Sequence, residues 1–193
     1  EKQVIDKPVF SADSANVYIE KQLSFGPRVP GTAAQKNAAA WMEEKLNAYC
    51  DTVFIQNTQV KAGNGKMLPC INIIGAINPQ AGKRILLLAH WDSRPWADMD
   101  VKDKDKGVLA ADDGGSGGAV LLELARQIQT KPLPKDLGID ILLTDVEDYG
   151  KTEWGDDSYA LGTQYWAKNP HVSGYNASFG ILLKMECARN SRY

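Results

Sequence analysis

The chain has 193 residues, 22 basic and 24 acidic side chains, a net charge of −2 at pH 7 and 44% apolar residues. This length is enough for one domain with its own core, and the ordinary apolar content excludes intrinsic disorder. The small net charge argues against a nucleic-acid partner. The longest aliphatic run, residues 85–89, is far shorter than the ~20 residues of a membrane-spanning helix. We therefore expect one catalytic-type domain over residues 1–193, without a membrane span.

The cysteines and the N-terminal segment are less informative. Cys50, Cys70 and Cys187 show no metal-site spacing, and their odd number leaves no complete set of disulfides, so we expect buried free thiols. No basic segment followed by an apolar one begins the chain, so no signal peptide is visible. A mature product whose leader has been removed would look the same.

The first half of the chain predicts two helices and a pair of strands. Ser11 is a suitable N-cap for a helix over residues 11–25. Apolar residues at three- and four-residue spacings indicate an amphipathic helix over residues 32–49. Strands are predicted at residues 53–60 and 70–77, separated by a turn at residues 63–65.

From residue 84 onward, predicted strands and helices alternate. Continuous apolar runs predict buried strands at residues 84–89, 139–144 and 179–183. Helices are predicted at residues 116–129 and 158–168, with a charged, solvated loop at residues 101–106. This order predicts a three-layer α/β fold with a central mixed, largely parallel sheet flanked by helices.

Polar residues follow the central strands and come together in such a fold. His90 and Asp92 follow the first buried strand, Asp113 precedes a helix, and Glu147 and Asp148 follow the next strand. Because sites in α/β folds lie at the carboxyl ends of the strands, we expect these groups at one edge of the sheet. An imidazole and carboxylates without a thiolate suit Zn²⁺ in an open catalytic site.

Different roles are open to these residues. Asp113 and Asp148 are candidate metal ligands, and His90, Asp92 and Asp112 are candidate ligands or supporting groups, with Asp92 two residues from the histidine that it could orient. Adjacent residues at a strand end point in different directions, so Glu147 can handle protons beside a metal-binding Asp148.

A serine hydrolase is an alternative interpretation of the same glycine-rich loop. Residues 114–118 match the G-x-S-x-G nucleophile elbow around Ser116, and Asp145 and His171 follow in the required order. The elbow needs a firm strand directly before the serine, and only residues 108–111 are available for one. Since four of the five residues in the match are glycine, the motif is weak.

The segments AHWDSRPWAD, AADDGGSGGAVLLELARQI, TDVEDYG and DDSYALGTQYWAKNP together resemble bacterial glutaminyl cyclases, which share the fold of the zinc aminopeptidases. The resemblance implies that Asp113 and Asp148 bind zinc and that Glu147 is the general acid/base. His90 matches a histidine that binds or lies near the metal, and Trp154 lies in a region that supplies an aromatic to the substrate pocket. It also implies a cis Asp113–Gly114 peptide or a comparable backbone outlier.

Two departures from the family concern the end of the chain. Lys184 stands where the family has an aspartate, in the region of the pocket, and its charge would repel a second Zn²⁺. The family's last zinc ligand is a histidine further downstream, whereas this chain ends at Tyr193. His171 lies on a turn, where exposure is expected rather than metal binding. We therefore expect a chain truncated at its C-terminus that, alone, holds zinc weakly and does not turn over.

For the intact protein, the resemblance implies a Zn²⁺-dependent glutaminyl-peptide cyclotransferase that converts an N-terminal Gln of a peptide or protein to pyroglutamate and releases ammonia. It also implies a periplasmic or secreted location. A zinc aminopeptidase remains an alternative, since Glu147 would then activate water instead of an amine. A non-catalytic relative without metal remains another.

Overall fold

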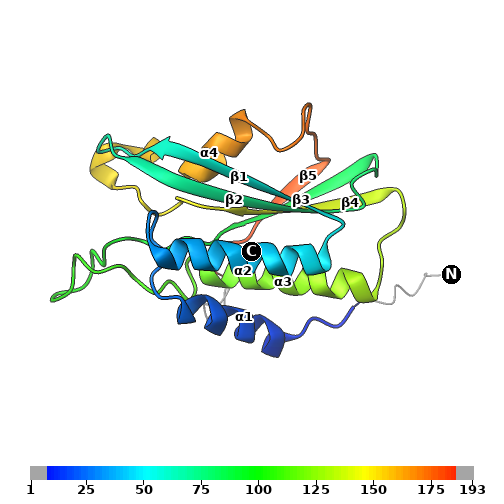
Figure 1. Ribbon diagram of the computed structural model, residues 1–193, viewed down its shortest axis with the longest axis horizontal. Helices are drawn as coiled ribbons and strands as arrows, with labels where there is room; N and C mark the ends of the chain where they lie inside the picture. The colour runs from blue at the N-terminus through cyan, green and yellow to red at the C-terminus, as the bar shows by residue number, and fades with distance from the viewer. Residues whose placement is uncertain (1–7, 186–193) are drawn as a thin grey trace.

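The computed structural model describes residues 8–185. Helices and strands alternate as the sequence predicts for the second half of the chain (Figure 1). In chain order they are α1 (Ala12–Ser24), α2 (Ala33–Tyr49), β1 (Thr52–Lys61), β2 (Met67–Ile77), β3 (Lys83–His90), α3 (Gly115–Thr130), β4 (Leu137–Thr144), the 3₁₀ turns η1 (Thr152–Trp154) and η2 (Asp156–Ser158), α4 (Leu161–Lys168) and β5 (Phe179–Leu182).

The five strands form one mixed sheet in the order β1-β2-β4-β3-β5. β3 pairs in parallel with both β4 and β5, whereas β2 is antiparallel to both β1 and β4. The predicted α/β class with a mixed central sheet is therefore confirmed, and its parallel part is confined to β4, β3 and β5. The parallel register places His90 opposite Thr144, so that β3 and β4 end at the same edge.

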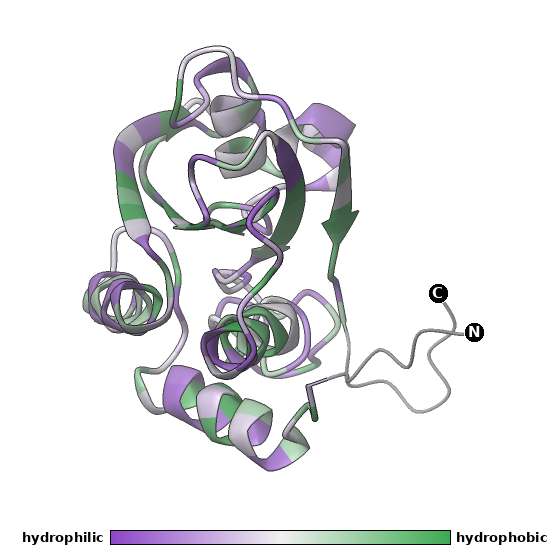
Figure 2. Cartoon of the chain, turned by 90° about the vertical axis from the view of Figure 1, so that its right-hand side faces the viewer, coloured by the Kyte–Doolittle hydropathy of each residue, from purple (hydrophilic) through white to green (hydrophobic). Residues whose placement is uncertain are grey.

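Helices cover both faces of the sheet. α2 and α3 lie on one face, with α1 packed outside α3, and α4 lies on the other face (Figure 1). Viewed from the end, the apolar stretches gather on the strands (Figure 2). The core between the sheet and helices α2 and α3 contains Leu46, Ile73, Leu121 and Leu143, none of which is exposed.

The predicted first residue of a helix is confirmed where a side chain caps the helix. The Ser11 hydroxyl accepts from Ser14 N at 3.1 Å, as expected for the N-cap of α1. The last helix was predicted from residue 158, but α4 begins at Leu161. Ala160 takes a left-handed φ of 54°, and its N–H donates to Glu147 O at 3.0 Å, so contacts with the β4 loop delay the helix.

The prediction of a buried strand at residues 179–183 is wrong in one respect. β5 forms, but all four of its residues are exposed, including Phe179 at 54% and Leu182 at 60%. Among the described residues it is an edge strand beside β3. The apolar composition therefore predicted that a strand forms here but not that it lies at the edge of the sheet. The β-branched and apolar pattern is local, whereas burial depends on what covers the strand.

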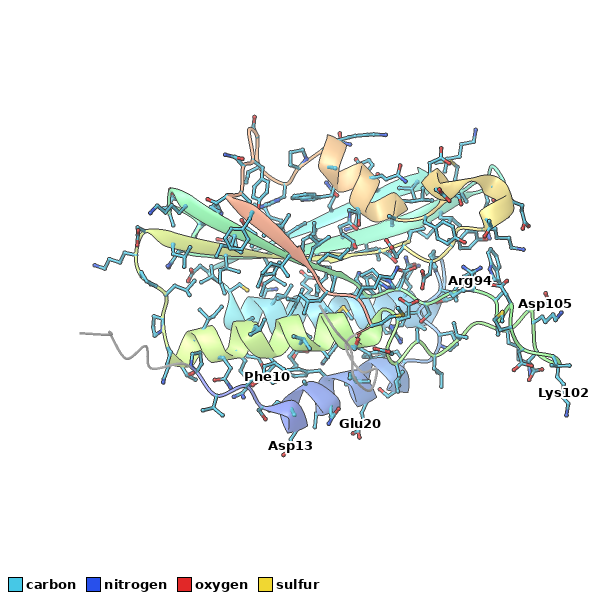
Figure 3. The ribbon with its side chains drawn as sticks, turned by 180° about the vertical axis from the view of Figure 1, so that it is seen from behind. Phe10, Asp13, Glu20, Arg94, Lys102 and Asp105 are labelled. Atoms are coloured by element: carbon cyan, nitrogen blue, oxygen red, sulfur yellow. The ribbon has the colours of Figure 1, made fainter. Side chains whose placement is uncertain are left out.

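The remaining predictions concern thiols and the charged loop. Cys50 and Cys70 are free thiols, half-buried and buried, while Cys187 lies outside the described residues. The predicted loop at residues 101–106 is exposed, and the segment that carries Lys102 and Asp105 extends well away from the sheet (Figure 3). None of the helices in the described part of the chain has the length and apolar character that a membrane span needs.

Candidate metal centre

The candidate centre lies where β3 and β4 end, beside the loop that leads into α3. His90 is the last residue of β3, and the following N–H, of Trp91, donates to Thr144 O at 3.0 Å. Gly114 brings the loop against this edge with φ +96°. A Cβ at Gly114 would lie 2.4 Å from Asp92 O and 3.1 Å from the His90 ring, so only glycine allows this approach.

His90, Asp113 and Asp148 offer three potential metal ligands to one point. One ligand atom from each lies within 4.8 Å of the others, and His90 Nε2 is 2.9 Å from Asp113 Oδ1. His90 and Asp148 are buried, whereas the Asp113 side chain is 43% exposed. The centre is therefore reached from solvent along the Asp113 side.

The electrostatics of the three groups show how strongly they interact. Burial opposes the charged form of His90, but hydrogen bonds to Asp113 and Asp92 outweigh it and raise its pKa to about 10. The hydrogen bond from His90 lowers the pKa of Asp113. Burial raises the pKa of Asp148 to about 6, although the charge of His90 acts in the opposite direction. The arrangement thus favours a positive charge among these carboxylates.

Asp92 holds the two strand ends in register with each other. Its Oδ1 accepts from Glu147 N at 3.0 Å and lies 3.2 Å from His90 Nδ1, and its Oδ2 accepts from Asp148 N at 3.2 Å. The residue is fully buried. It therefore sets the orientation of the His90 ring and of the backbone that carries Glu147 and Asp148.

Arg28, which the sequence patterns did not single out, binds the backbone of the two loops that carry Asp92 and Asp113. Its buried guanidinium donates to the carbonyl oxygens of Trp91 at 2.8 Å, Leu109 at 2.8 Å and Ala110 at 2.9 Å. Burial lowers the pKa of Arg28 to about 10, and the Asp92 charge opposes this shift. An arginine in a loop carries no periodic signal, so only the tertiary contacts identify this role.

Glu147 and Lys184 meet at the mouth of a small cavity beside the three ligands. Lys184 Nζ donates to Glu147 Oε1 at 3.2 Å, and the two side chains are 38% and 18% exposed. The cavity, of about 90 Å³, is also lined by His90, Thr144 and Thr163. The predicted proton-handling residue and the predicted pocket lysine are thus brought together with the histidine.

Val146, directly before Glu147, has a strained backbone. Its φ is 54°, a left-handed conformation that is unfavourable for a β-branched residue. The expected cis peptide at Asp113–Gly114 is absent, since no described peptide bond is cis. Gly114 has a φ of +96°, which is an ordinary conformation for glycine, so the structure shows no comparable backbone outlier at this bond either.

Asp112 and Trp154 lie outside the group of three ligands. Asp112 Oδ1 accepts from the Ser116 hydroxyl at 2.9 Å at the start of α3. Trp154 packs edge-on to Trp96, with ring centroids 5.8 Å apart, and covers Gly63 of the β1–β2 turn. It does not line the cavity at Glu147, so the structure gives Trp154 a place in an aromatic cluster instead.

The serine-hydrolase alternative is not supported by the contacts of its three residues. The Ser116 hydroxyl bonds to Asp112, and Asp145 accepts from Gln35 Nε2 at 2.6 Å. His171 accepts a hydrogen bond from Trp166 on the α4 side of the sheet, at 3.2 Å. The three residues therefore have separate partners, and His171 is half-buried among aromatic rings rather than on a free turn.

The donor set fits zinc. Tetrahedral zinc ligands, bonded at about 2.0–2.2 Å, lie about 3.4 Å from each other, which is within the spacing of His90, Asp113 and Asp148. A zinc ion held by one nitrogen and two carboxylate ligands would keep one of its four positions for a further ligand. Lys184 lies beyond the three ligands and acts against a further cation there.

Comparisons with known proteins agree with this architecture. Residues 72–193 match the model of peptidase family M28. A glutaminyl-peptide cyclotransferase of Drosophila melanogaster is 30% identical over 163 residues, covering 83% of this chain and 44% of that protein. The glutaminyl cyclase of Tannerella forsythia is 49% identical, with a TM-score of 0.86 over 92% of this chain and 62% of that one. A Zn-dependent exopeptidase of Parabacteroides distasonis is 47% identical, with a TM-score of 0.88 and the same two coverages.

The chain spans less than two thirds of the length of each of these relatives. The resemblance to bacterial glutaminyl cyclases is confirmed, and the sheet and its helices match those of zinc exopeptidases. Because the family model matches more than half of the residues, the chain belongs to peptidase family M28.

Proposed function

We propose that the protein is a zinc-dependent glutaminyl-peptide cyclotransferase. The observation that carries this proposal is the Glu147 carboxylate at a cavity beside His90, Asp113 and Asp148. The chain in which it lies is 49% identical to a glutaminyl cyclase. The substrate would be a peptide or protein with an N-terminal glutamine, and the products pyroglutamate and ammonia.

His90, Asp113 and Asp148 are the residues that would hold zinc. A zinc ion bound there would polarise the carbonyl of the glutamine side-chain amide. The α-amine of the same residue forms the new C–N bond, while the bond from that carbonyl carbon to the amide nitrogen breaks. Because nucleophile and electrophile belong to one residue, the site needs only to hold them in the reactive conformation.

Glu147 is placed to move the proton in this reaction. Its carboxylate takes a proton from the attacking amine and gives it to the leaving nitrogen, which departs as ammonia. Asp92 fixes the Glu147 backbone, and the strained φ of Val146 turns the adjacent residues in different directions. Glu147 can therefore face the cavity while Asp148 joins the ligand group.

The test is an assay of the protein expressed from its full open reading frame, with zinc supplied, in parallel with the 193-residue chain. A peptide with N-terminal glutamine should release ammonia and lose the mass of one ammonia, whereas a leucine anilide should not be cleaved. Cleavage of the anilide without cyclisation of the glutamine peptide would instead establish an aminopeptidase. If the zinc-loaded protein shows neither cyclisation nor anilide cleavage, both the cyclotransferase and the aminopeptidase are contradicted.

We also propose a periplasmic or secreted location, which is supported by the resemblance to bacterial glutaminyl cyclases alone. Fractionation of the source cells with an antibody against the chain tests it. Recovery of the protein in the cytoplasmic fraction would contradict this location and leave the proposed chemistry unaffected.

A further inference from the structure

The backbone that leads to Lys184 is held from two sides. Leu183 N donates to Leu88 O of β3 at 2.9 Å. On the other side, α3 approaches so closely that a Cβ at Gly117 would lie 2.8 Å from Leu183 O. Strand and helix therefore position the lysine next to the candidate centre.

The ammonium group of Lys184 lies where carboxylates converge. Its Nζ is 3.2 Å from Glu147 Oε1, and the charges of Asp113 and Asp148 also act on it. Glu147 is mostly shielded from water, with 18% of its side chain exposed. The ammonium therefore donates to one oxygen of a carboxylate that lines the cavity.

The proposed reaction brings a chemically similar group to the same carboxylate. An N-terminal amine, like the lysine side chain, is a primary amine on an aliphatic carbon and donates hydrogen bonds to a carboxylate. The cavity at Glu147 has about 90 Å³ of free space with Lys184 in place, so an amine can reach this carboxylate. An incoming amine that takes Glu147 Oε1 as its acceptor displaces the lysine from that oxygen, and two ammonium groups at one carboxylate repel each other.

We propose that Lys184 is an internal competitor of the substrate amine: its ammonium occupies the amine position at Glu147 and weakens binding of peptides through their N-terminus. This inference rests on the proposed function, because it takes Glu147 as the group that receives the amine. Lys184 then lowers the affinity for the substrate by occupying Glu147, and it takes no part in the bonds that form or break.

The first test measures binding without turnover. A peptide beginning with norleucine resembles a glutamine peptide in size but cannot cyclise, and its N-acetylated form lacks the amine. We expect Lys184→Met to strengthen calorimetric binding of the free-amine peptide about fivefold, the size expected for loss of a partly exposed ion pair. Binding of the acetylated peptide should not change. Lys184→Arg, which keeps the cation, should behave as the wild type.

Lys83→Met is the matched control, because Lys83 is also an ion-paired lysine, 4.0 Å from Asp136, but is the first residue of β3, at the opposite end of the strand from His90. It should leave binding of both peptides unchanged. If Lys184→Met does not fold, Lys184→Gln removes the same charge and replaces it in the test. Equal strengthening of the acetylated peptide would show general widening of the cavity and would overturn the proposal.

The second test separates affinity from turnover at saturating zinc. Lys184→Met should lower KM for a glutamine peptide by about fivefold and change kcat by less than about twofold. Cyclisation with unchanged KM and unchanged amine binding would overturn the inference while the proposed function stands. If Lys184→Met binds the free-amine peptide more tightly but neither the wild type nor the variant cyclises a glutamine peptide, the proposed function is contradicted. The competition between Lys184 and the amine for Glu147 would still be supported.

Discussion

The two histidines of the chain lie in opposite environments. His90, at the carboxyl end of β3, contacts two carboxylates, and its pKa rises to about 10. His171, on the α4 side of the sheet, lies among Phe54, Trp166 and Tyr175, and burial lowers its pKa. The same imidazole side chain is thus held among carboxylates in one region and packed among aromatic rings in the other.

This difference follows from the side chains that the fold brings to each histidine. Around His90, Asp92 and Asp113 supply negative charge that offsets the cost of burying a cation. Around His171, the ring accepts from Trp166 Nε1 at 3.2 Å, which requires an unprotonated Nδ1. The His90 region is therefore built around charge, and the His171 region around apolar packing.

The largest expected effect concerns packing in the His171 region. Trp166 is 8% exposed and packs against Ile74 and Leu142, so Trp166→Ala should lower the free energy of unfolding by about 3–5 kcal/mol. Urea denaturation measures it. Phe179→Ala removes a ring that is 54% exposed and should change stability by no more than about 0.5 kcal/mol. A loss below about 1 kcal/mol for Trp166→Ala would show that this region is not a packed core.

The second prediction concerns proton transfer beside His90. Glu147→Gln keeps the shape of the side chain and removes its basic oxygen, so cyclisation should slow by at least ~10²-fold. Zinc content, measured by elemental analysis, should stay near the wild-type level. Glu153→Gln is the control, since that carboxylate is 70% exposed and forms an ion pair with Lys151 at 3.8 Å, away from the three candidate ligands. Near-normal activity of Glu147→Gln would remove Glu147 from proton transfer.

The third prediction compares the two histidines directly. His90→Ala removes one of the three candidate ligands and should weaken zinc binding at least ~10-fold, the smallest loss expected even for a group that only orients a ligand. His171→Ala should leave zinc affinity unchanged. Competition with a chromophoric chelator measures both. Equal affinity of the two variants would exclude His90 from the metal centre.

The smallest expected effect is a pH dependence of stability that comes from His171. The pKa of His171 is lower in the folded protein than its ordinary value of 6.5, so between these two values the unfolded chain binds more protons. The free energy of unfolding should therefore fall as the pH drops through this window. The fall should be smaller in His171→Gln, which keeps a hydrogen-bond acceptor for Trp166 but does not titrate.

Urea denaturation at about pH 7.5 and about pH 5.5, on either side of the ordinary histidine pKa, tests this difference. Subtracting the variant from the wild type removes the contribution of other titrating groups. A wild type that loses less stability on acidification than His171→Gln would mean that the charged imidazole is favoured in the folded state. The contrast between the two regions would then fail.

The candidate residues differ in how far the sequence could place them. The alternation of strands and helices after residue 84 predicted that His90, Asp113 and Asp148 would meet, because parallel strands deliver their carboxyl ends to one edge. Trp154 was expected near the pocket, but it packs over Gly63 instead. An aromatic side chain has no directional requirement that sequence position can express, so its neighbours decide where it packs.

Local features of the chain were thus accessible from residue order alone. Apolar periodicity identified α2 and the interior strands, and Ser11 identified the start of α1. These signals act over a few residues, since a helix repeats every 3.6 residues and a strand every 2. They identified the elements and the residues at their ends.

Contacts between distant segments were decided by the tertiary structure. β4 inserts between β2 and β3, which puts Asp92 against the backbone of Glu147 and Asp148. The left-handed Ala160 delays α4, and the edge position of β5 leaves its residues exposed while Lys184 reaches Glu147. None of these outcomes has a local period, because each depends on the strand order and on the packing of segments that lie far apart in the chain.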